Sequence, residues 1–206
     1  EDIPPPLAPP PDGVTCNSLR EEYKIACDAP VVLYTGNLEK YQGIGLVMDS
    51  ASLIVESEPA VRFLIVGGSS EDVKRYRGVA ESIGLADNFV FTGSKPMEFM
   101  PVFMEMADIL LSPRLEGTNT PLKIYTYLSS GKAIVATNLP THTQVLTKNV
   151  AILTKPEKME YANGVLLLLR DRVLRGKLSE NGRNLVKQKY NFNIFKSKLD
   201  LAYRKV

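Results

Sequence analysis

The sequence predicts an α/β fold, a doubly wound, mostly parallel six-stranded Rossmann-like sheet with helices on both faces. Three observations predict it. Short apolar runs alternate with segments of helical spacing along the chain. The runs are apolar at nearly every position, which is typical of strands buried on both faces of a parallel sheet. The first three runs end in glycine, at Gly36, at Gly67 and Gly68, and at Gly93.

The individual elements follow from the same patterns. A first helix is expected at 18–25, where Ser18 suits the N-cap and acidic residues follow it. Strands are expected at the apolar runs 31–36, 61–68, 88–93, 107–113, 133–137 and 150–155. Further helices are expected at 42–55, 69–83 and 96–106, from 120 onward, and as two or three segments after 157.

Composition limits the classes of protein that the chain can belong to. With 206 residues, 44% of them hydrophobic and 23% charged, the chain is long enough to bury a core. A net charge of +2 gives no argument for a nucleic-acid partner. No apolar run approaches the roughly 18 residues of a membrane span. The only cysteines are Cys16 and Cys27, which favours a reducing, cytoplasmic setting over a disulfide scaffold.

The chain is expected to divide into a proline-rich linker at 1–17 and one domain at 18–206. His142 is the only histidine, so a multi-histidine metal site is excluded, and no Cys/His cluster has zinc-ligand spacing. His142 itself is expected at a solvated turn before a short helix. No metal site is therefore predicted.

The glycines at the strand ends suggest where a ligand binds. In open α/β sheets, ligands bind outside the carboxyl ends of the strands, and glycine lets them approach the backbone. The alternative is that each glycine only ends its strand in a tight turn. No G-x-G-x-x-G follows the first predicted strand, so a nicotinamide or flavin dinucleotide is not expected.

Residues 117–123 have the features of an anion site at the start of a helix. Gly117 allows close approach, and Thr118 and Thr120 can donate hydroxyl hydrogens. Pro121 suits the first helical turn, where its missing N–H costs nothing. Lys123 lies in the same turn, where a cation opposes the helix dipole unless an anion shares the site. The alternative is an ordinary capped helix with a solvated Lys123.

Five segments follow one another in a characteristic order: VVLYTGNLEKYQGI, VRFLIVGG, NFVFTG with ADILLSP, EGTNTPLKIYTYLSSGKAIVAT and YNFNIFKSKLDLAYRKV. Together they resemble the C-terminal, donor-binding half of a GT-B fold glycosyltransferase of the retaining group 1 type, also called family four. The resemblance covers about residues 18–206. It implies a binding site for a nucleoside-diphosphate sugar.

The resemblance also assigns residues to that site. It implies that the diphosphate is held by 36–43 and 117–123, and that the base and ribose lie near Gly67, Gly68 and 94–96. Glu116 is the candidate for contact with the donor sugar, and Arg114 and Lys123 are candidates for supplying positive charge. The residues that the resemblance assigns to donor binding are Gly36, Asn37, Gln42, Gly43, Gly67, Gly68, Lys95, Gly117, Thr118, Asn119, Thr120, Pro121, Leu122 and Thr126.

Three positions depart from the family pattern. Asn37 replaces an arginine, Gln42 replaces a lysine, and Thr126 replaces a glutamate that binds ribose hydroxyls. The two lost cations would each make charge-assisted hydrogen bonds, which are roughly twice as strong as neutral ones. Two hypotheses therefore stay open: an enzyme, or a non-catalytic nucleotide-sugar-binding module. A response-regulator-like or phosphatase-like domain is disfavoured because no cluster of acids follows a strand.

Under the enzyme hypothesis, the chain is the donor half of a retaining glycosyltransferase. It requires no cofactor beyond its nucleotide-sugar donor, because fixed amides, a helix dipole and cations stabilise the departing diphosphate. The acceptor binds to an N-terminal domain of the same full-length chain, so this half alone is expected to be inactive. A membrane-lipid acceptor and a peripheral position at the inner membrane face are compatible with this arrangement. No nucleic-acid partner is expected.

Overall fold

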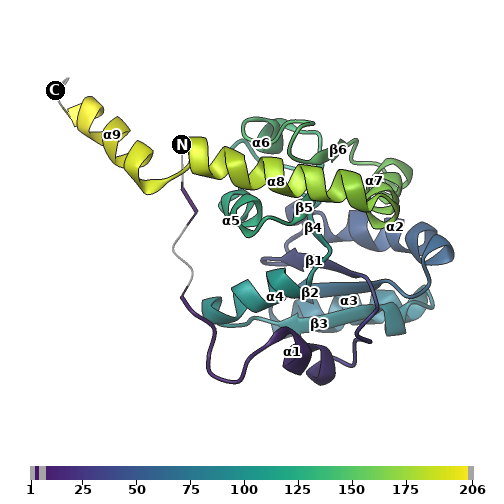
Figure 1. Ribbon diagram of the computed structural model, residues 1–206. Coiled ribbons are helices and arrows are strands. Elements are labelled where there is room, and N and C mark those ends of the chain that lie inside the picture. Colours follow the sequence, from purple (N-terminus) through teal and green to yellow (C-terminus); the bar gives the residue numbers. More distant parts are fainter. Residues whose placement is uncertain (1–2, 5–7, 204–206) are drawn as a thin grey trace.

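The computed structural model describes residues 3–4 and 8–203, and it contains one parallel sheet (Figure 1). The strand order is β3-β2-β1-β4-β5-β6, and Figure 1 labels the strands from bottom to top in this order. This is the order of a doubly wound dinucleotide-type sheet. The predicted fold class is confirmed. The strands are β1 (Val31–Thr35), β2 (Arg62–Val66), β3 (Phe89–Gly93), β4 (Ile109–Ser112), β5 (Ala133–Thr137) and β6 (Ile152–Thr154).

Helices connect these strands and follow the last of them. The α-helices are α1 (Cys16–Glu22), α2 (Ile44–Ser57), α3 (Ser70–Ser82), α4 (Met100–Met106), α5 (Lys123–Ser130), α6 (Pro140–Thr143), α7 (Lys158–Arg170), α8 (Arg172–Lys189) and α9 (Phe192–Tyr203). Short 3-10 turns are η1 (Lys40–Gln42), η2 (Ala86–Asn88) and η3 (Met97–Phe99). Figure 1 shows α9 projecting away from the body of the molecule beyond α8. Residues 204–206 of the closing segment lie outside the described residues.

The core consists of two layers, one on each face of the sheet. Successive residues of a strand point to opposite faces, so Val31 and Leu33 pack into one layer while Val32 and Tyr34 pack into the other. Helices α1, α4 and α5 cover the first layer, and α2 and α7 cover the second. Because both faces are covered, the strands are apolar at nearly every position, and their polar residues lie near the strand ends.

Several predicted boundaries move, each for a local reason. The first helix begins at Cys16, because Thr15 is the N-cap and Ser18 is its reciprocal partner in a capping box. This helix therefore starts inside the segment 1–17 that was predicted as a linker, and the division into linker and domain stays a prediction. Residues 1–2 and 5–7 of that segment lie outside the described residues. Helix α5 begins at Lys123, and Pro121 precedes it.

The second predicted helix also starts later than expected. Gly43 adopts φ +79°, so it ends a 3-10 turn and α2 begins at Ile44. The predicted helix at 69–83 is confirmed, because Ser69 caps α3 and Gly84 follows it with φ +72°. In the described part of the chain, no helix combines the length and the apolar character that crossing a bilayer requires.

The centre of the sheet determines where a cleft can open. Strand β1 pairs with β2 on one side and with β4 on the other, and β4 pairs with β5 beyond it. The chain therefore leaves the ends of β1 and β4 toward opposite sides, which makes their carboxyl ends the topological switch point. The turns after β1 and β2 touch there, because a Cβ on Gly67 would overlap the carbonyl of Gly36.

We predict that Gly67→Ala destabilises the fold by about 2 kcal/mol or more. Gly67 has φ +121°, and the added methyl group would meet the Gly36 backbone, which cannot move away as a side chain could. Gly78→Ala is the matched control, since Gly78 lies inside α3 with open space at its Cβ position. That change should stabilise the protein by about 0.5–1 kcal/mol. Denaturant unfolding measures both, and equal effects would contradict the packing described here.

Candidate functional site

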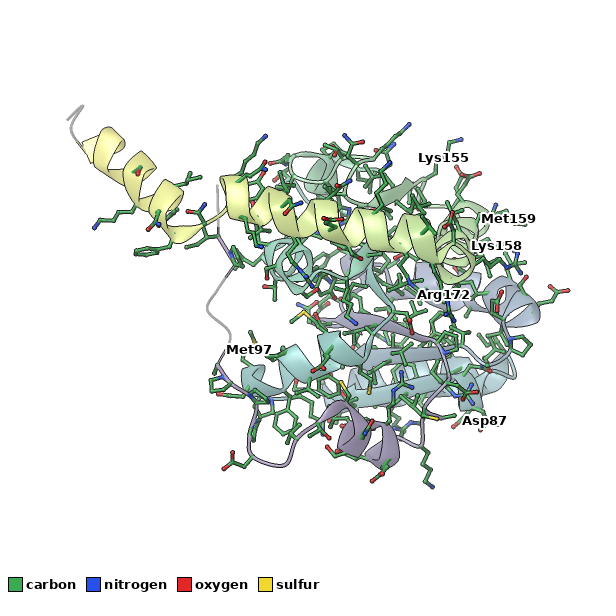
Figure 2. The ribbon with its side chains drawn as sticks, in the orientation of Figure 1. Asp87, Met97, Lys155, Lys158, Met159 and Arg172 are labelled. Carbon is green, nitrogen blue, oxygen red and sulfur yellow. The ribbon has the colours of Figure 1, made fainter. Side chains whose placement is uncertain are left out.

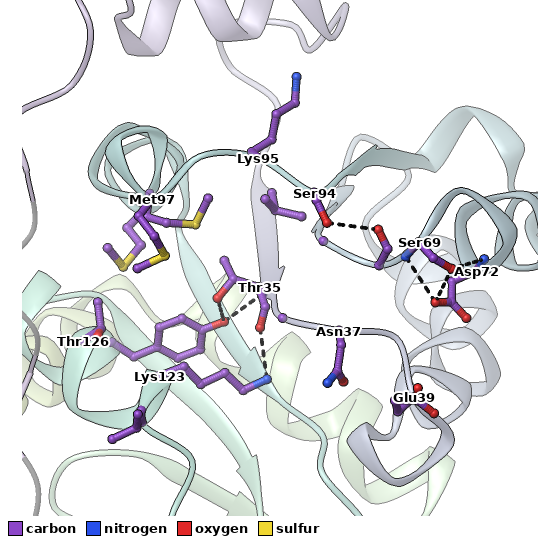
Figure 3. A pocket seen from close by; sticks show the side chains of 18 residues that line it. Thr35, Asn37, Glu39, Ser69, Asp72, Ser94, Lys95, Met97, Lys123 and Thr126 are labelled. Atoms are coloured by element: carbon purple, nitrogen blue, oxygen red, sulfur yellow. Dashed lines mark hydrogen bonds between the residues drawn. The ribbon is translucent and has the colours of Figure 1, made fainter.

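A cleft with a volume of about 700 Å³ opens at the carboxyl ends of β1, β2 and β3, beside α4 and α5 (Figure 3). It lies at the sheet edge where the strand-end glycines predicted a ligand site. The predicted site residues that line it are Gly36, Asn37, Gly67, Gly68, Lys95, Leu122, Lys123 and Thr126. The other predicted residues belong to the loops next to it and do not line the cleft.

Backbone turns at the strand ends form one side of the cleft. The Gly36 amide donates to the Val66 carbonyl at 3.0 Å, and the Gly67 amide donates to the Gly93 carbonyl at 2.8 Å. The turns that follow β1 and β2 and the end of β3 are therefore hydrogen-bonded to one another, which continues the sheet beyond its strands. Packing against the Gly36 backbone is by itself a sufficient reason for a glycine at position 67. Gly36 has φ +137°, and a Cβ there would lie 3.1 Å from the Tyr34 hydroxyl and 3.5 Å from Lys123 Nζ.

Lys123 is a cation that the structure places in the cleft. From the first residue of α5 its side chain reaches across to β1, where Nζ donates to the Thr35 carbonyl at 3.1 Å (Figure 3). Nζ also lies 4.0 Å from the centroid of the Tyr34 ring. No carboxylate of the described residues forms an ion pair with it. Within the described part of the chain, the ammonium group is thus held by a carbonyl and an aromatic face.

The surroundings of Lys123 make its charge easy to lose. Burial lowers the pKa of Lys123 to about 7, and the positive charge of Arg114 acts in the same direction. Near neutral pH the side chain is therefore only partly protonated in the ligand-free protein. An anion bound in the cleft would favour the ammonium form and raise this pKa.

Two buried tyrosines hold the turn after β1. Tyr34 donates its hydroxyl hydrogen to the Asn37 carbonyl at 2.7 Å, and the Tyr127 hydroxyl accepts from the Thr35 amide at 2.9 Å. Neither tyrosine was among the predicted site residues. The available signal was a tyrosine in an otherwise aliphatic strand, since a buried hydroxyl needs a hydrogen-bond partner.

One wall of the cleft is apolar and the opposite one is polar. Met97, Met100, Met104 and Leu122 form the apolar wall. Figure 3 shows Met97 across the cleft from Ser69 and Asp72. A flat apolar ring would fit against the methionines while its polar edge faced the backbone turns. Such an amphipathic cleft suits a nucleoside better than a purely charged ligand.

Lys95 and Thr126 lie at the edges of the cleft. Lys95 Nζ is 3.6 Å from Glu22 Oε1, which gives this cation a partner in α1. Its Nζ also lies 5.6 Å from the centroid of the Tyr23 ring, and the neighbouring Tyr23 is the chief cause of the raised pKa of Lys95. Thr126 is partly buried in α5 and lines the cleft, but its hydroxyl supplies no negative charge.

A second loop, residues 113–120, lies beside the turn after β1. The Leu115 amide donates to the Tyr41 carbonyl at 2.8 Å, and a Cβ on Gly43 would overlap the Pro113 carbonyl. Close packing therefore accounts for Gly43. Gln42 lies in the same contact region, and its buried Oε1 has no hydrogen-bond partner among the described residues.

Arg114 turns its guanidinium group onto its own loop. Nε donates to the Glu116 carbonyl at 2.7 Å, and Nη2 donates to Asn119 Oδ1 at 3.3 Å. The guanidinium also lies 5.4 Å from the centroid of the Tyr41 ring. Glu116, Gly117, Thr118 and Asn119 are exposed, whereas Thr120 and Pro121 are buried.

The backbone of this loop has an unequal distribution of hydrogen bonds. The carbonyl groups of Arg114, Glu116, Thr118 and Asn119 all accept hydrogen bonds from side chains. In contrast, the amide N–H groups of 116–120 donate to no group of the described residues. A row of free amides next to the start of a helix is a binding surface for an anion.

The prediction of a solvated His142 is wrong. The side chain is fully buried, Nδ1 donates to the Thr137 carbonyl at 2.9 Å, and Nε2 accepts from Ser112 Oγ at 2.8 Å. The tautomer follows because a carbonyl can only accept. Burial lowers the pKa of His142 to about 4, so the ring is neutral at physiological pH and ties the ends of β4 and β5 together. No trio of His, Cys, Asp or Glu in the described region is arranged to hold a metal ion.

Comparison with known sequences identifies one family. The family model described as glycosyl transferases group 1 matches residues 17–185. The phosphatidyl-myo-inositol mannosyltransferase of Mycobacterium leprae (strain TN) is 24% identical over 202 residues, which cover 95% of this chain and 53% of the relative. The alpha-D-kanosaminyltransferase of Streptomyces kanamyceticus is 25% identical over 193 residues, covering 91% and 48%. The chain thus spans about half the length of the curated relatives it matches.

Solved structures with the same fold cover nearly the whole chain. Anabaena HepE, solved in complex with UDP, gives a TM-score of 0.83 at 19% identity and covers 93% of this chain and 52% of that chain. The C-terminal domain of a group 1 family glycosyl transferase (LpcC) from Francisella tularensis gives a TM-score of 0.73 at 18% identity. The match covers 90% of this chain and 97% of that domain. These likenesses show the fold.

We predict that replacing Lys123 by methionine removes a pH dependence from the stability of the fold. The pKa of Lys123 is about 7 in the folded state, against 10.5 for an unperturbed lysine. Between these pH values the unfolded chain binds more protons, so the free energy of unfolding of the wild type rises with pH. Lys123→Met should lack this rise and should be the more stable protein at pH 7.

The control for this prediction is Lys155→Met. Lys155 is exposed, and Figure 2 shows it at the surface, well away from the cleft residue Met97. Chemical unfolding measured at intervals from about pH 6 to about pH 10 compares the three proteins across the window between the two pKa values. A Lys123→Met profile parallel to those of the wild type and the control would contradict a half-buried, easily neutralised lysine.

Proposed function

Because the chain belongs to the group 1 family of glycosyl transferases, we propose that it is the donor-binding half of a glycosyltransferase. The reaction moves a sugar from a nucleoside-diphosphate sugar to an acceptor. The observation that carries the proposal is Lys123, a cation without a carboxylate partner among the described residues, which lies at the switch point next to free loop amides. Relatives with transferase names and a structural neighbour solved with UDP support the same class of ligand.

The donor fits the cleft in one orientation. The nucleoside lies between the methionine wall and the turns at Gly67 and 94–96, where apolar surface and backbone groups face each other. The diphosphate then lies beside Gly36, close to Lys123 and the start of α5. The amides of 116–120 bind the terminal phosphate and the sugar, and Glu116 contacts the sugar. In this orientation each chemical part of the donor meets a surface of matching polarity.

Catalysis in this proposal is electrostatic. As the bond to the sugar breaks, negative charge grows on the leaving diphosphate. Protonated Lys123, the dipole of α5 and the loop amides stabilise that charge from fixed positions. We assign a retaining reaction, in which the acceptor attacks from the face that the leaving group occupies. This reaction requires no general base from the donor-binding half. Of the carboxylates that line the cleft, Asp72 already accepts hydrogen bonds from Ser69 and Arg75.

The acceptor belongs to another part of the full-length protein. The chain spans about half the length of its curated relatives, and we assign acceptor binding to an N-terminal domain of the same chain. One relative is named for phosphatidyl-myo-inositol, which is a lipid. A lipid acceptor at the inner membrane face is therefore one candidate, and the isolated half is expected to bind the donor without transferring the sugar.

A non-catalytic nucleotide-sugar-binding module is the second candidate. It is favoured by Asn37 and Thr126, which line the cleft without the charges found in the family pattern. Gln42 lies in packed contacts beside Gly43 and does not line the cleft. The two candidates share the donor site, and they differ in whether the full-length protein turns over.

We predict that this chain binds UDP, GDP or ADP weakly and that Lys123→Met weakens the binding about tenfold. A hydrogen bond to a charged group contributes about 1.5–3 kcal/mol, which corresponds to about tenfold or more in affinity. Lys155→Met should bind as the wild type does. Isothermal titration at about pH 6.5, where Lys123 is mostly protonated, is the measurement. A wild-type chain that gives no heat with any of the three nucleotides would exclude a diphosphate site here.

We further predict that Thr126→Glu increases nucleotide affinity a few-fold, because a carboxylate can accept hydrogen bonds from ribose hydroxyls. The matched control is Thr143→Glu, at an exposed threonine outside the cleft. In the full-length protein, the wild type should already transfer sugar, and Thr126→Glu should only tune the rate. A wild type that binds donor but acquires turnover only with both Thr126→Glu and Gln42→Lys would support the non-catalytic module instead.

A further inference from the structure

We propose that Thr141 of α6 and Gln144, which follows this helix, are positioning residues that aim the free amides of residues 116–120 at the ligand. The inference rests on the proposed function, because the ligand of these amides is taken to be a diphosphate. Neither residue lines the cleft, so neither can act by touching the nucleotide there. Both act through the carbonyl groups of the loop.

The two ends of the loop are anchored by Leu115, whose amide donates to the Tyr41 carbonyl, and by the buried Thr120. Residues 115–119 are exposed, so they contribute no buried side chain to either core layer. Their shape depends chiefly on hydrogen bonds to carbonyl groups. Thr141 Oγ1 donates to the Asn119 carbonyl at 2.8 Å, and Gln144 Nε2 donates to the Thr118 carbonyl at 2.6 Å. Arg114 Nε, from within the loop, donates to the Glu116 carbonyl at 2.7 Å.

These contacts determine the direction of the amides. In a planar trans peptide the C=O and N–H bonds point in opposite directions, and no cis peptide occurs in the described residues. A Thr118 carbonyl held by Gln144 therefore turns the Asn119 N–H away from α6. In the same way, Thr141 turns the Thr120 N–H away. Two donors are thus aimed together from one side of the loop.

Thr141 is anchored in the core, and the exposed Gln144 is flanked by buried residues. Thr141 and His142 are fully buried, and His142 bonds to Ser112 at the end of β4 and to Thr137 at the end of β5. Residues 145–146, directly after Gln144, are buried in the core layer shared with α5. The loop is therefore held against the sheet itself, which suits a group that must not move as charge develops nearby.

The test compares matched variants of α6 and its flank. Thr141→Val and Gln144→Leu remove one donor each at nearly constant size, and Thr141→Ser restores the hydroxyl. Thr143→Val is the control, because Thr143 lies on the same helix, is exposed, and makes no side-chain hydrogen bond with the described residues. UDP and UMP are the probes, since only UDP carries the second phosphate.

We expect Thr141→Val and Gln144→Leu each to weaken UDP binding about threefold to tenfold, the effect of one lost hydrogen bond. UMP binding should stay unchanged, and Thr141→Ser and Thr143→Val should resemble the wild type. Titration of this chain with both nucleotides measures the ratio of the two affinities. Equal losses for UDP and UMP, or UDP affinities that match those of Thr143→Val, would overturn the proposal.

A second measurement does not depend on any ligand. Backbone ¹⁵N order parameters of 117–120 should fall in Thr141→Val and Gln144→Leu relative to the wild type and Thr143→Val. Unchanged order parameters would overturn the positioning role. A wild type that binds neither UDP nor UMP, with these order parameters falling as expected, would instead count against the proposed function alone.

Discussion

The cleft depends on one constraint, the pairing of β1 with β4 at the centre of the sheet. Because the chain leaves these two strands toward opposite sides, no connection crosses above their carboxyl ends. The same pairing brings the start of α5 within reach of β1, so that Lys123 meets the Thr35 carbonyl. The donor site that we propose is the space this topology leaves open, and Gly36, Gly67 and Gly68 line it.

The site combines a rigid frame with an unfavourable charge. Removing an ammonium group from much of its water without a carboxylate partner costs stability, and the lowered pKa of the half-buried Lys123 expresses that cost. A bound diphosphate would relieve it by supplying the missing negative charge. The loop likewise presents positive groups without a negative partner. Its carbonyls accept hydrogen bonds from side chains, whereas its amides have no partner among the described residues. Both features have a common physical reason in our proposal, in which an anion completes the site.

The sheet can be predicted well from the sequence because each strand and turn is specified by residues close together in the chain. Apolar runs, strand-end glycines and the Ser69 cap specify their elements without reference to distant residues. The site is less predictable because its contacts join distant segments. Nothing near His142 indicates burial, since its partners Ser112 and Thr137 meet it only when β4 and β5 lie side by side. Likewise, the direction of Lys123 depends on β1, and the contacts of Arg114 within its own loop depend on how that loop folds.

The most direct test of the account is a crystal structure of this chain with UDP bound. The account predicts density for the diphosphate between Gly36 and the first turn of α5, with the Lys123 ammonium moved from the Thr35 carbonyl onto a phosphate oxygen. The base should lie against the methionine wall. Diphosphate density outside the cleft, or a nucleotide inside it whose phosphates face away from Lys123, would contradict the central claim.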